Sequence, residues 1–136
     1  SHEQQQLQQV ATLRTTVSQI KHVPLNETVG YSRKGRLKRD SVIATVAIGY
    51  ADGINRRLGN GIGKFLVNGR LAPIVGNVCM DMCMLDVTDI PVREGDEVIV
   101  FGPELPVTKL AESLGTIPYE VLAGISQRVK RVYFQE

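Results

Sequence analysis

Apolar and polar residues alternate over short stretches along most of this chain, which is the pattern of half-buried β-strands. The first such stretch is residues 11–23, where Leu13, Thr15 and Val17 alternate with polar neighbours. Residues 41–48 are almost continuously apolar and predict a strand that is buried on both faces. Further strands are predicted over residues 64–67, 70–75, 78–87, 97–101 and 126–134.

Glycine, proline and asparagine mark the connections between these strands. Asn68-Gly69 lies between two apolar runs and is typical of a type I′ hairpin turn, in which both central residues need a positive φ. Residues 24–27 and 94–96 predict further turns. Residues 51–63 contain four glycines and two adjacent arginines, and residues 32–40 are rich in basic side chains, so both segments are predicted to be loops.

Helical signals are confined to the last third of the chain. Thr108 is predicted to cap a short helix that runs to Leu114 and ends at Gly115. Pro118 suits the first turn of a second short helix. The predicted fold is therefore mainly β, a compact antiparallel β-barrel or sandwich with two short helices. Residues 1–10 are expected to be a linker or a frayed N-terminus, and residues 11–136 to form one domain.

Composition and charge limit the class of protein but do not indicate a function. The chain has 136 residues, 43% of them hydrophobic and 22% charged, which is ordinary for a soluble domain. The net charge of +2 is too small to predict a nucleic-acid-binding protein. No apolar run approaches the roughly 20 residues of a membrane span, and the N-terminal residues lack the pattern of a signal peptide.

The two cysteines, Cys79 and Cys83, are expected to be free thiols. On one strand they would share a face but lie ~13 Å apart, which is too far for a disulfide. Neither His2 nor His22 is close to them in sequence, so no metal site is predicted. Two free thiols favour a reducing, cytoplasmic location.

Three of the four tyrosines, Tyr31, Tyr50 and Tyr119, lie beside glycine or proline at the boundaries of predicted elements. Such boundaries are where functional side chains project from a scaffold, although a tyrosine there is also commonly a half-buried anchor. The tyrosines alone therefore leave a structural and a functional interpretation open.

The segments around these tyrosines form a series of ordered motifs. They are Thr-Val-Gly-Tyr at 28–31, Ile-Gly-Tyr-Ala-Asp-Gly at 48–53 with Arg56, the strand-like segment 72–84, Ile-Pro-Tyr-Glu-Val-Leu at 117–122, and the closing segment 126–133. In this order they resemble the C-terminal domain of alanine racemase, the pyridoxal-phosphate enzyme that interconverts L- and D-alanine, and the resemblance covers residues 11–134.

The resemblance implies that Tyr31 is a catalytic base. Racemisation removes a proton from one face of the α-carbon and returns one to the other, so two acid–base groups on opposite faces suffice. The family uses a Schiff-base lysine on one face and a tyrosine on the other. Because a free phenol has a pKa of about 10, such a tyrosine needs a lowered pKa or a hydrogen-bond relay.

The same resemblance implies substrate and cofactor contacts. Met80 is expected to meet the substrate carboxylate through its backbone N–H, and Cys79 and Asp81 to line the same spot. Tyr50 is expected to narrow the entry corridor, and Tyr119 to bind the cofactor phosphate through its hydroxyl.

None of the six lysines matches the family's Schiff-base motif. Pyridoxal phosphate is therefore expected to be bound mainly by an N-terminal barrel domain that these residues do not include. The family's active sites lie between the subunits of a homodimer, so Tyr31 and Met80 should serve the partner's cofactor, whereas Tyr119 serves its own. The chain alone should be inactive, and the complete isomerase should make D-alanine for the peptidoglycan of the cell wall.

The basic segment 33–39, with five lysines and arginines among seven positions, departs from the family pattern and supports an alternative. An independent β-barrel module could use it to bind a polyanion such as nucleic acid. The low aromatic content of 5% argues against that alternative, because single-stranded nucleic acids need stacking platforms. A dimerisation domain that has lost catalysis is a third interpretation, which the retained Tyr31 and Met80 disfavour.

Overall fold

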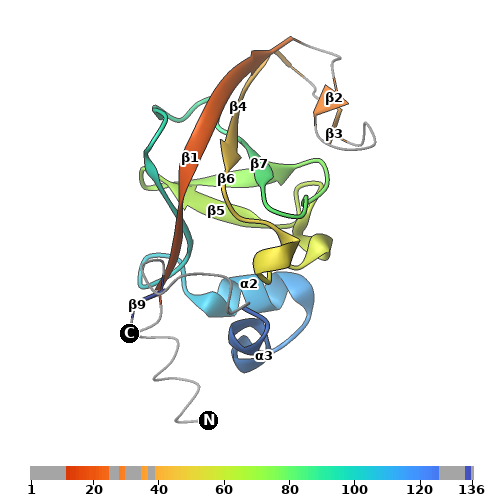
Figure 1. The fold of residues 1–136 in the computed structure, drawn as a ribbon, viewed down its shortest axis with the longest axis vertical. Helices are drawn as coiled ribbons and strands as arrows, with labels where there is room; N and C mark the ends of the chain where they lie inside the picture. The colour runs from red at the N-terminus through yellow and green to blue at the C-terminus, as the bar shows by residue number, and fades with distance from the viewer. Residues whose placement is uncertain (1–11, 25–27, 30–34, 37–38, 126–133, 136) are drawn as a thin grey trace.

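The computed structural model describes residues 12–24, 28–29, 35–36, 39–125 and 134–135, and most of them lie in short strands (Figure 1). The strands are β1 (Thr12–Val23), β2 (Thr28–Val29), β3 (Gly35–Arg36), β4 (Ser41–Val46), β5 (Lys64–Val67), β6 (Arg70–Val75), β7 (Cys83–Asp86), β8 (Glu97–Phe101) and β9 (Phe134–Gln135). The helical elements are the 3₁₀ turns η2 (Tyr50–Asp52) and η3 (Arg56–Leu58) and the α-helices α2 (Val107–Leu114) and α3 (Pro118–Ala123).

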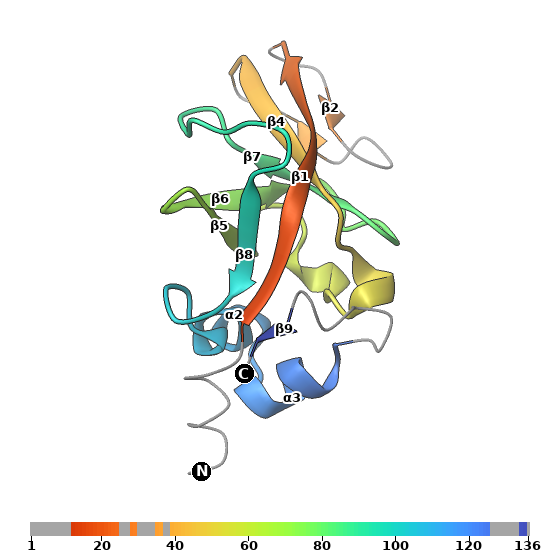
Figure 2. The same cartoon turned by 60° about the vertical axis from the view of Figure 1, so that its left-hand side comes forward.

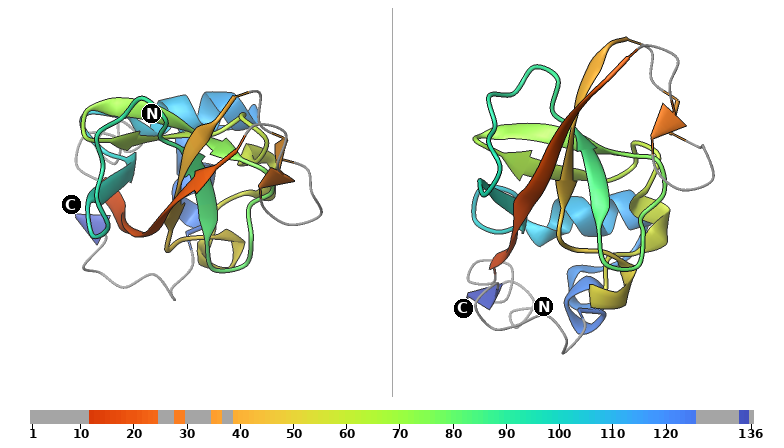
Figure 3. Two further views of the ribbon diagram at one scale, coloured as in Figure 1. Left: turned by 90° about the horizontal axis from the view of Figure 1, so that it is seen from above. Right: turned by 45° about the horizontal axis from the view of Figure 1, so that its top comes forward.

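Strand β1 closes the sheet into a barrel. The strand order is β4-β7-β6-β5-β8-β1-β9, every pairing is antiparallel, and β1 also pairs with β4. The first part of β1 lies against β8 and the second part against β4, with register irregularities at Leu13/Arg14 and Val17/Gln19 that let it bend (Figures 2 and 3). The prediction of an antiparallel barrel is therefore confirmed.

The Asn68-Gly69 turn also follows the prediction. Strands β5 and β6 pair from Val67↔Arg70 outwards, and φ is 49° at Asn68 and 81° at Gly69. Two successive positive φ values match the right-handed twist of the strands that they join.

The core fills the barrel and extends to α2, which closes one end. Phe65, Leu85 and Phe101 are fully buried inside the strands. The buried side chains of α2, among them Val107 and Leu110, belong to the same hydrophobic cluster, and Figure 1 shows α2 and α3 beneath the strands. No helix in the described part of the chain is long and apolar enough to cross a membrane.

The two helices end and begin largely as predicted. Gly115 terminates α2 with φ 69°, and Pro118 is the first residue of α3. The predicted cap is wrong, because Thr108 lies within the first turn and Pro106 is the N-cap residue. Pro106 has a φ of −58° and an extended ψ of 143°, and the helix begins directly after it at Val107, one residue before Thr108.

Three strand and loop predictions need correction. The predicted strand 78–87 is shortened to β7, because residues 76–82 form a loop. The loop 51–63 contains the end of η2 and all of η3. Strand β3 lies within the predicted basic loop 32–40 and pairs with β2. The prediction that β4 is buried on both faces is confirmed, since Ile43 and Ala44, which point to opposite faces, are both buried.

The predicted closing strand 126–134 falls mostly outside the described residues. Its described remainder, β9, pairs with Thr12 and Leu13 at the start of β1. The last strand therefore adds to the barrel beside its first strand.

Candidate functional site

The motif Gly49-Tyr50-Ala51-Asp52-Gly53 folds into a single tight turn. The Asp52 N–H donates to the Gly49 carbonyl at 3.0 Å, and the Gly49 N–H donates to Oδ2 of Asp52 at 3.0 Å. Gly53 closes the turn with its N–H on the Tyr50 carbonyl at 3.1 Å and a φ of 105°. Because that φ favours glycine, the glycine at position 53 of the motif suits the end of this turn.

This turn holds the loop that precedes β7. The Tyr50 N–H donates to the Cys79 carbonyl at 2.9 Å, and the Ala51 N–H donates to the Met80 carbonyl at 2.8 Å. The Cys79 N–H in turn donates to the Met82 carbonyl at 2.9 Å. Two motifs that are thirty residues apart in sequence are thus joined through their main chains.

Gly49 makes this close approach possible. A Cβ at Gly49 would lie 2.2 Å from the Cys79 carbonyl oxygen and 2.6 Å from that of Met80, far inside van der Waals contact. The φ of Gly49 is −149°, which any residue can adopt, so the constraint is space rather than conformation.

The opposite end of the turn rests on α3. A Cβ at Gly53 would lie 2.3 Å from the Gly124 carbonyl oxygen and 2.7 Å from the Ile125 Cα. Helix α3 carries Tyr119, the residue with the predicted phosphate contact. The turn therefore lies between the predicted substrate loop and the helix of the predicted cofactor contact.

The side chains around this junction are open to solvent. Met80 is 55% exposed, Tyr50 42% and Met82 40%, and Asp81 is also exposed. The guanidinium of Arg56 lies over the Tyr50 ring, 5.2 Å from its centroid, which is a cation–π contact. Three large apolar side chains on one exposed surface are typical of an interaction site.

The main chain of the loop has hydrogen-bonding capacity left over. The N–H groups of Met80 and Asp81 find no acceptor among the described residues. The carbonyls of the same two peptide units, those of Cys79 and Met80, are by contrast engaged by the N–H groups of Tyr50 and Ala51. An N–H donor at an exposed and fixed position can bind an anion.

The two cysteines differ although they flank the same loop. Cys79 is half-buried, and its Sγ lies 3.8 Å from the Asn77 carbonyl oxygen. Cys83 is fully buried, and desolvation, followed by the charge of Cys79, raises the pKa of its thiol to about 12. Cys83 is therefore a protonated core residue and not a nucleophile.

The structure brings four of the six predicted site residues together. The side chains of the other two are not among those that it describes. Tyr50, Cys79, Met80 and Asp81 meet at the turn and loop. Tyr31 lies outside the described residues, and of Tyr119 only its place in α3 is described. Residue-level reasoning missed Asp52, whose burial at 8% exposure comes from the turn rather than from any apolar pattern.

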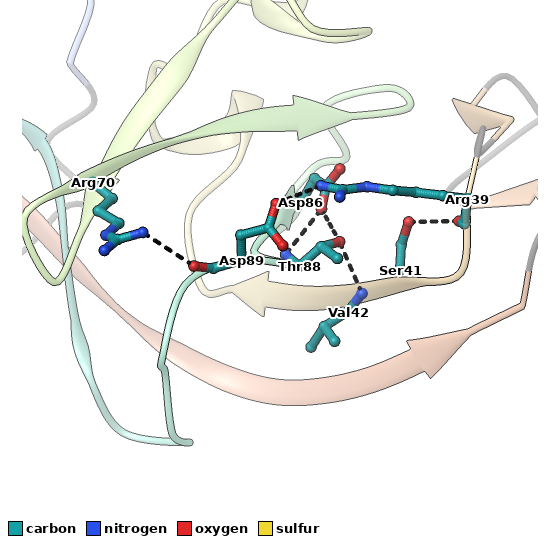
Figure 4. A network of polar contacts seen from close by, with 7 residues as sticks. All are labelled: Arg39, Ser41, Val42, Arg70, Asp86, Thr88 and Asp89. Carbon is teal, nitrogen blue, oxygen red and sulfur yellow. Dashed lines mark hydrogen bonds and ion pairs between the residues drawn. The ribbon is translucent and has the colours of Figure 1, made fainter.

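A second polar cluster lies where β7 ends, away from this site (Figure 4). Arg39 pairs with Asp89 at 2.8 Å, and this hydrogen bond raises the pKa of the guanidinium. The Thr88 hydroxyl donates to Asp86 and accepts the Val42 N–H at 3.2 Å. Of the basic segment 33–39, Arg39 has its side chain described, and that side chain is engaged in this cluster.

A groove of about 450 Å³ lies elsewhere, between α2 and strands β5 and β6. No group of three or more His, Cys, Asp or Glu side chains that could hold a metal ion occurs in the described ranges. The turn and loop at Tyr50 and Met80 are therefore the best candidate for a functional site.

Comparisons with known proteins agree with this choice. The family model of the alanine racemase C-terminal domain matches residues 10–133. Alanine racemase 1 of Clostridium acetobutylicum is 46% identical over 134 residues, which cover 95% of this chain and 34% of that protein.

Solved structures match as well. The biosynthetic alanine racemase from Pseudomonas aeruginosa superposes with a TM-score of 0.82 at 37% identity, over 87% of this chain and 33% of that one. The alanine racemase from Bartonella henselae with covalently bound pyridoxal phosphate gives 0.82 at 37%, over 86% and 33%. The chain spans about a third of the length of these relatives. It belongs to the family of alanine racemase C-terminal domains.

Proposed function

We propose that this chain is the C-terminal part of a cytoplasmic, homodimeric, pyridoxal-phosphate-dependent alanine racemase that supplies D-alanine for peptidoglycan. One observation carries the proposal: a loop fixed by the Gly49–Gly53 turn presents the unengaged N–H of Met80 at an exposed position. Family membership supplies the reaction.

Met80 has the geometry that a small carboxylate needs. Its N–H shares a peptide unit with the Cys79 carbonyl, which the Tyr50 N–H holds at 2.9 Å, and its own carbonyl is held by the Ala51 N–H at 2.8 Å, so the peptide units on both sides of Met80 are fixed before the substrate arrives. A hydrogen bond from a backbone N–H to an ionised carboxylate is shorter and stronger than a neutral one. In this role the side chain of Met80 need not be polar, and Cys79 and Asp81 line the same spot.

Tyr31 acts on the α-carbon in this proposal. Its phenolate takes the proton from L-alanine, and its phenol returns one in the opposite direction. A lysine outside this chain serves the other face of the α-carbon. Since a free phenol has a pKa of about 10, Tyr31 needs a hydrogen-bond partner or a cationic neighbour in the complete site.

The described residues fit one wall of a cofactor site rather than the whole of it. Their three lysines, Lys21, Lys64 and Lys109, are all exposed and far from the enclosed setting that a Schiff-base lysine requires. Tyr119 on α3 is the residue that would hold the phosphate. Pyridoxal phosphate, when bound, supplies an electron sink for the carbanion at the α-carbon.

The exposure of the site argues for a second subunit. Tyr50, Met80 and Met82 are each 40% exposed or more, and a homodimer would cover them with the N-terminal barrel domain of the partner. Tyr50, stacked against Arg56, then narrows the corridor that leads to the α-carbon. The alternative of a polyanion-binding module gains nothing from Arg39, which is already paired with Asp89.

The test is racemisation by the full-length protein and by this chain alone. Tyr31→Phe should lower kcat for L-alanine by about 100-fold or more, because it removes an acid–base group while keeping the ring. The matched control, Tyr133→Phe, removes a hydroxyl without an assigned role and should keep the parental rate. This chain with pyridoxal phosphate should be inactive, and activity should return when the N-terminal domain is added.

Parental activity in Tyr31→Phe would refute the role of the tyrosine. Racemisation by the isolated chain would refute the division of the site between two domains.

A further inference from the structure

Asp52 is a buried carboxylate that none of the proposed catalytic contacts uses. It is 8% exposed, within the exposed turn that also carries Tyr50. Burying an ionisable group is unfavourable unless its hydrogen bonds are satisfied, so its partners indicate what it does.

The carboxylate of Asp52 accepts a hydrogen bond from the start of the turn. Oδ2 of Asp52 accepts the Gly49 N–H at 3.0 Å, while its own N–H donates to the Gly49 carbonyl at 3.0 Å. These two bonds fix Gly49 from both sides. Gly49 is itself buried, so without the carboxylate its N–H would lose its acceptor in a place that water reaches poorly.

The residues immediately after Gly49 hold the Met80 loop. The N–H groups of Tyr50 and Ala51 donate to the carbonyls of Cys79 and Met80 at 2.9 and 2.8 Å. The Gly49 Cα is in such close contact with the same carbonyls that a Cβ would lie 2.2 Å from one of them. A rotation of the turn at Gly49 would therefore move both donors away from the loop.

We propose that Asp52 is a positioning residue that fixes the Met80 N–H for the substrate carboxylate by holding the Gly49–Gly53 turn against the 79–82 loop. Asp52 itself touches no substrate. Its role rests on the proposed function, since the position of Met80 matters for catalysis only if its N–H meets alanine. The mechanical part, the hold on the loop, is independent of any activity.

The experiment compares Asp52→Ala, Asp52→Asn and Asp89→Ala in the full-length protein. Asp89→Ala is the matched loss of a carboxylate at the far cluster, where the side chain is 73% exposed. Three quantities are measured: kcat and KM for L-alanine, the inhibition constant of propionate, and deuterium uptake by the peptide that contains Tyr50 and Ala51. Propionate has the carboxylate of the substrate without its amino group.

Asp52→Ala should raise KM and the inhibition constant together by about tenfold, with a smaller change in kcat, because a displaced donor weakens carboxylate binding. Its Tyr50–Ala51 peptide should exchange faster, since both amides lose their fixed acceptors. Asp52→Asn keeps an oxygen for the Gly49 N–H and should stay within about threefold of the parent. Asp89→Ala should change none of these.

The positioning role would be overturned if the inhibition constant of propionate were unchanged in Asp52→Ala. It would also be overturned if kcat and KM changed equally in Asp52→Ala and Asp89→Ala. If Asp52→Ala does not fold, Asp52→Glu replaces it, because the longer side chain displaces the carboxylate. A parental KM in Asp52→Glu would likewise overturn the positioning role.

If the parent does not racemise alanine, the proposed function fails on its own. The exchange contrast between Asp52→Ala and Asp89→Ala then still decides whether Asp52 holds the loop.

Discussion

Strand β7 has a loop at each end, and the two loops differ in how far side-chain contacts add to the main-chain bonds that hold them. The loop before it, residues 76–82, is tied by main-chain hydrogen bonds to the Gly49–Gly53 turn and by the Asn60 N–H to the Gly76 carbonyl at 2.8 Å. The loop after it, residues 87–96, is held by main-chain bonds to Val17 and Val42 and, in addition, by several side-chain bonds. Asn68 donates to the Pro91 carbonyl at 2.7 Å and to Asp96 at 3.1 Å, and Arg39 pairs with Asp89.

The difference shows what each loop can do. Main-chain bonds do not titrate and leave side chains free, so the 76–82 loop can expose Met80 and Met82 to a partner or a substrate. The 87–96 loop is held additionally by polar side chains, among them Arg39 and Arg70, which bond to Asp89 in Figure 4, and such contacts respond to pH and salt. A fixed site is better built on the first kind of loop.

The largest expected effect comes from filling the space at Gly49. Gly49→Ala should lower the free energy of unfolding by about 3 kcal/mol, because its Cβ would enter the van der Waals shell of two carbonyl oxygens. Gly61→Ala is the control: φ is 89° there but the space is open, so strain alone should cost about 1 kcal/mol. Urea unfolding measures both. Equal losses would mean that the turn and loop are not in close contact.

The two thiols should differ in reactivity, because one lies in the exposed loop and the other in the strand that follows it. Cys79 is half-buried, whereas Cys83 is buried with the pKa of its thiol at about 12, so Cys83 is unionised at neutral pH. Alkylation at pH 8, followed by mass spectrometry, should modify Cys79 first and Cys83 only on unfolding. Cys79→Ser is the control and should remove the fast phase. Rapid double labelling of the folded chain would contradict the burial of β7.

Acid should weaken the loop after β7 through Asp96. The Arg93 N–H at 2.9 Å and the Asn68 amide hold the pKa of its carboxyl below the usual range. A lowered folded pKa adds stability above the unfolded value, and this stability is lost as pH falls through the folded pKa. The difference in the free energy of unfolding between the parent and Asp96→Asn should therefore be constant above about pH 5 and should decrease as the pH falls below about 4.

The matched control for that experiment is Glu104→Gln, which removes an exposed carboxylate with no hydrogen bond among the described residues. A gap between parent and Asp96→Asn that stays constant down to pH 2 would show that the charge of Asp96 does not hold the loop.

The smallest effect belongs to the Arg39–Asp89 pair. Its side chains are 58% and 73% exposed, so solvent screens the attraction, and Arg39→Gln should shift the melting temperature least of these variants. The shift should vanish in 1 M salt, where the screening length is about 3 Å. A shift that persists in high salt would indicate that Arg39 contributes through packing rather than charge.

Short-range signals in the sequence predicted the elements well where a single residue type decides the backbone. The Asn68-Gly69 turn, the end of α2 at Gly115 and the start of α3 at Pro118 all follow from local conformational limits. The strand predicted over 78–87 failed for the complementary reason. Val78, Cys79 and Met80 are as apolar as strand residues, but the carbonyls of Cys79 and Met80 accept hydrogen bonds from a turn about thirty positions earlier in the chain.

The sequence by itself determined the strand pattern, the turn chemistry and, through ordered motifs, the family. Tertiary structure decided that β1 bends to pair with both β8 and β4, which closes the barrel. It also decided that Tyr50 and Met80 share one site and that the side chain of Asp52, a residue of the turn, is buried. The physical reason is that local φ and ψ preferences are encoded residue by residue, whereas the partner of a carbonyl depends on which distant segment the packed core brings beside it.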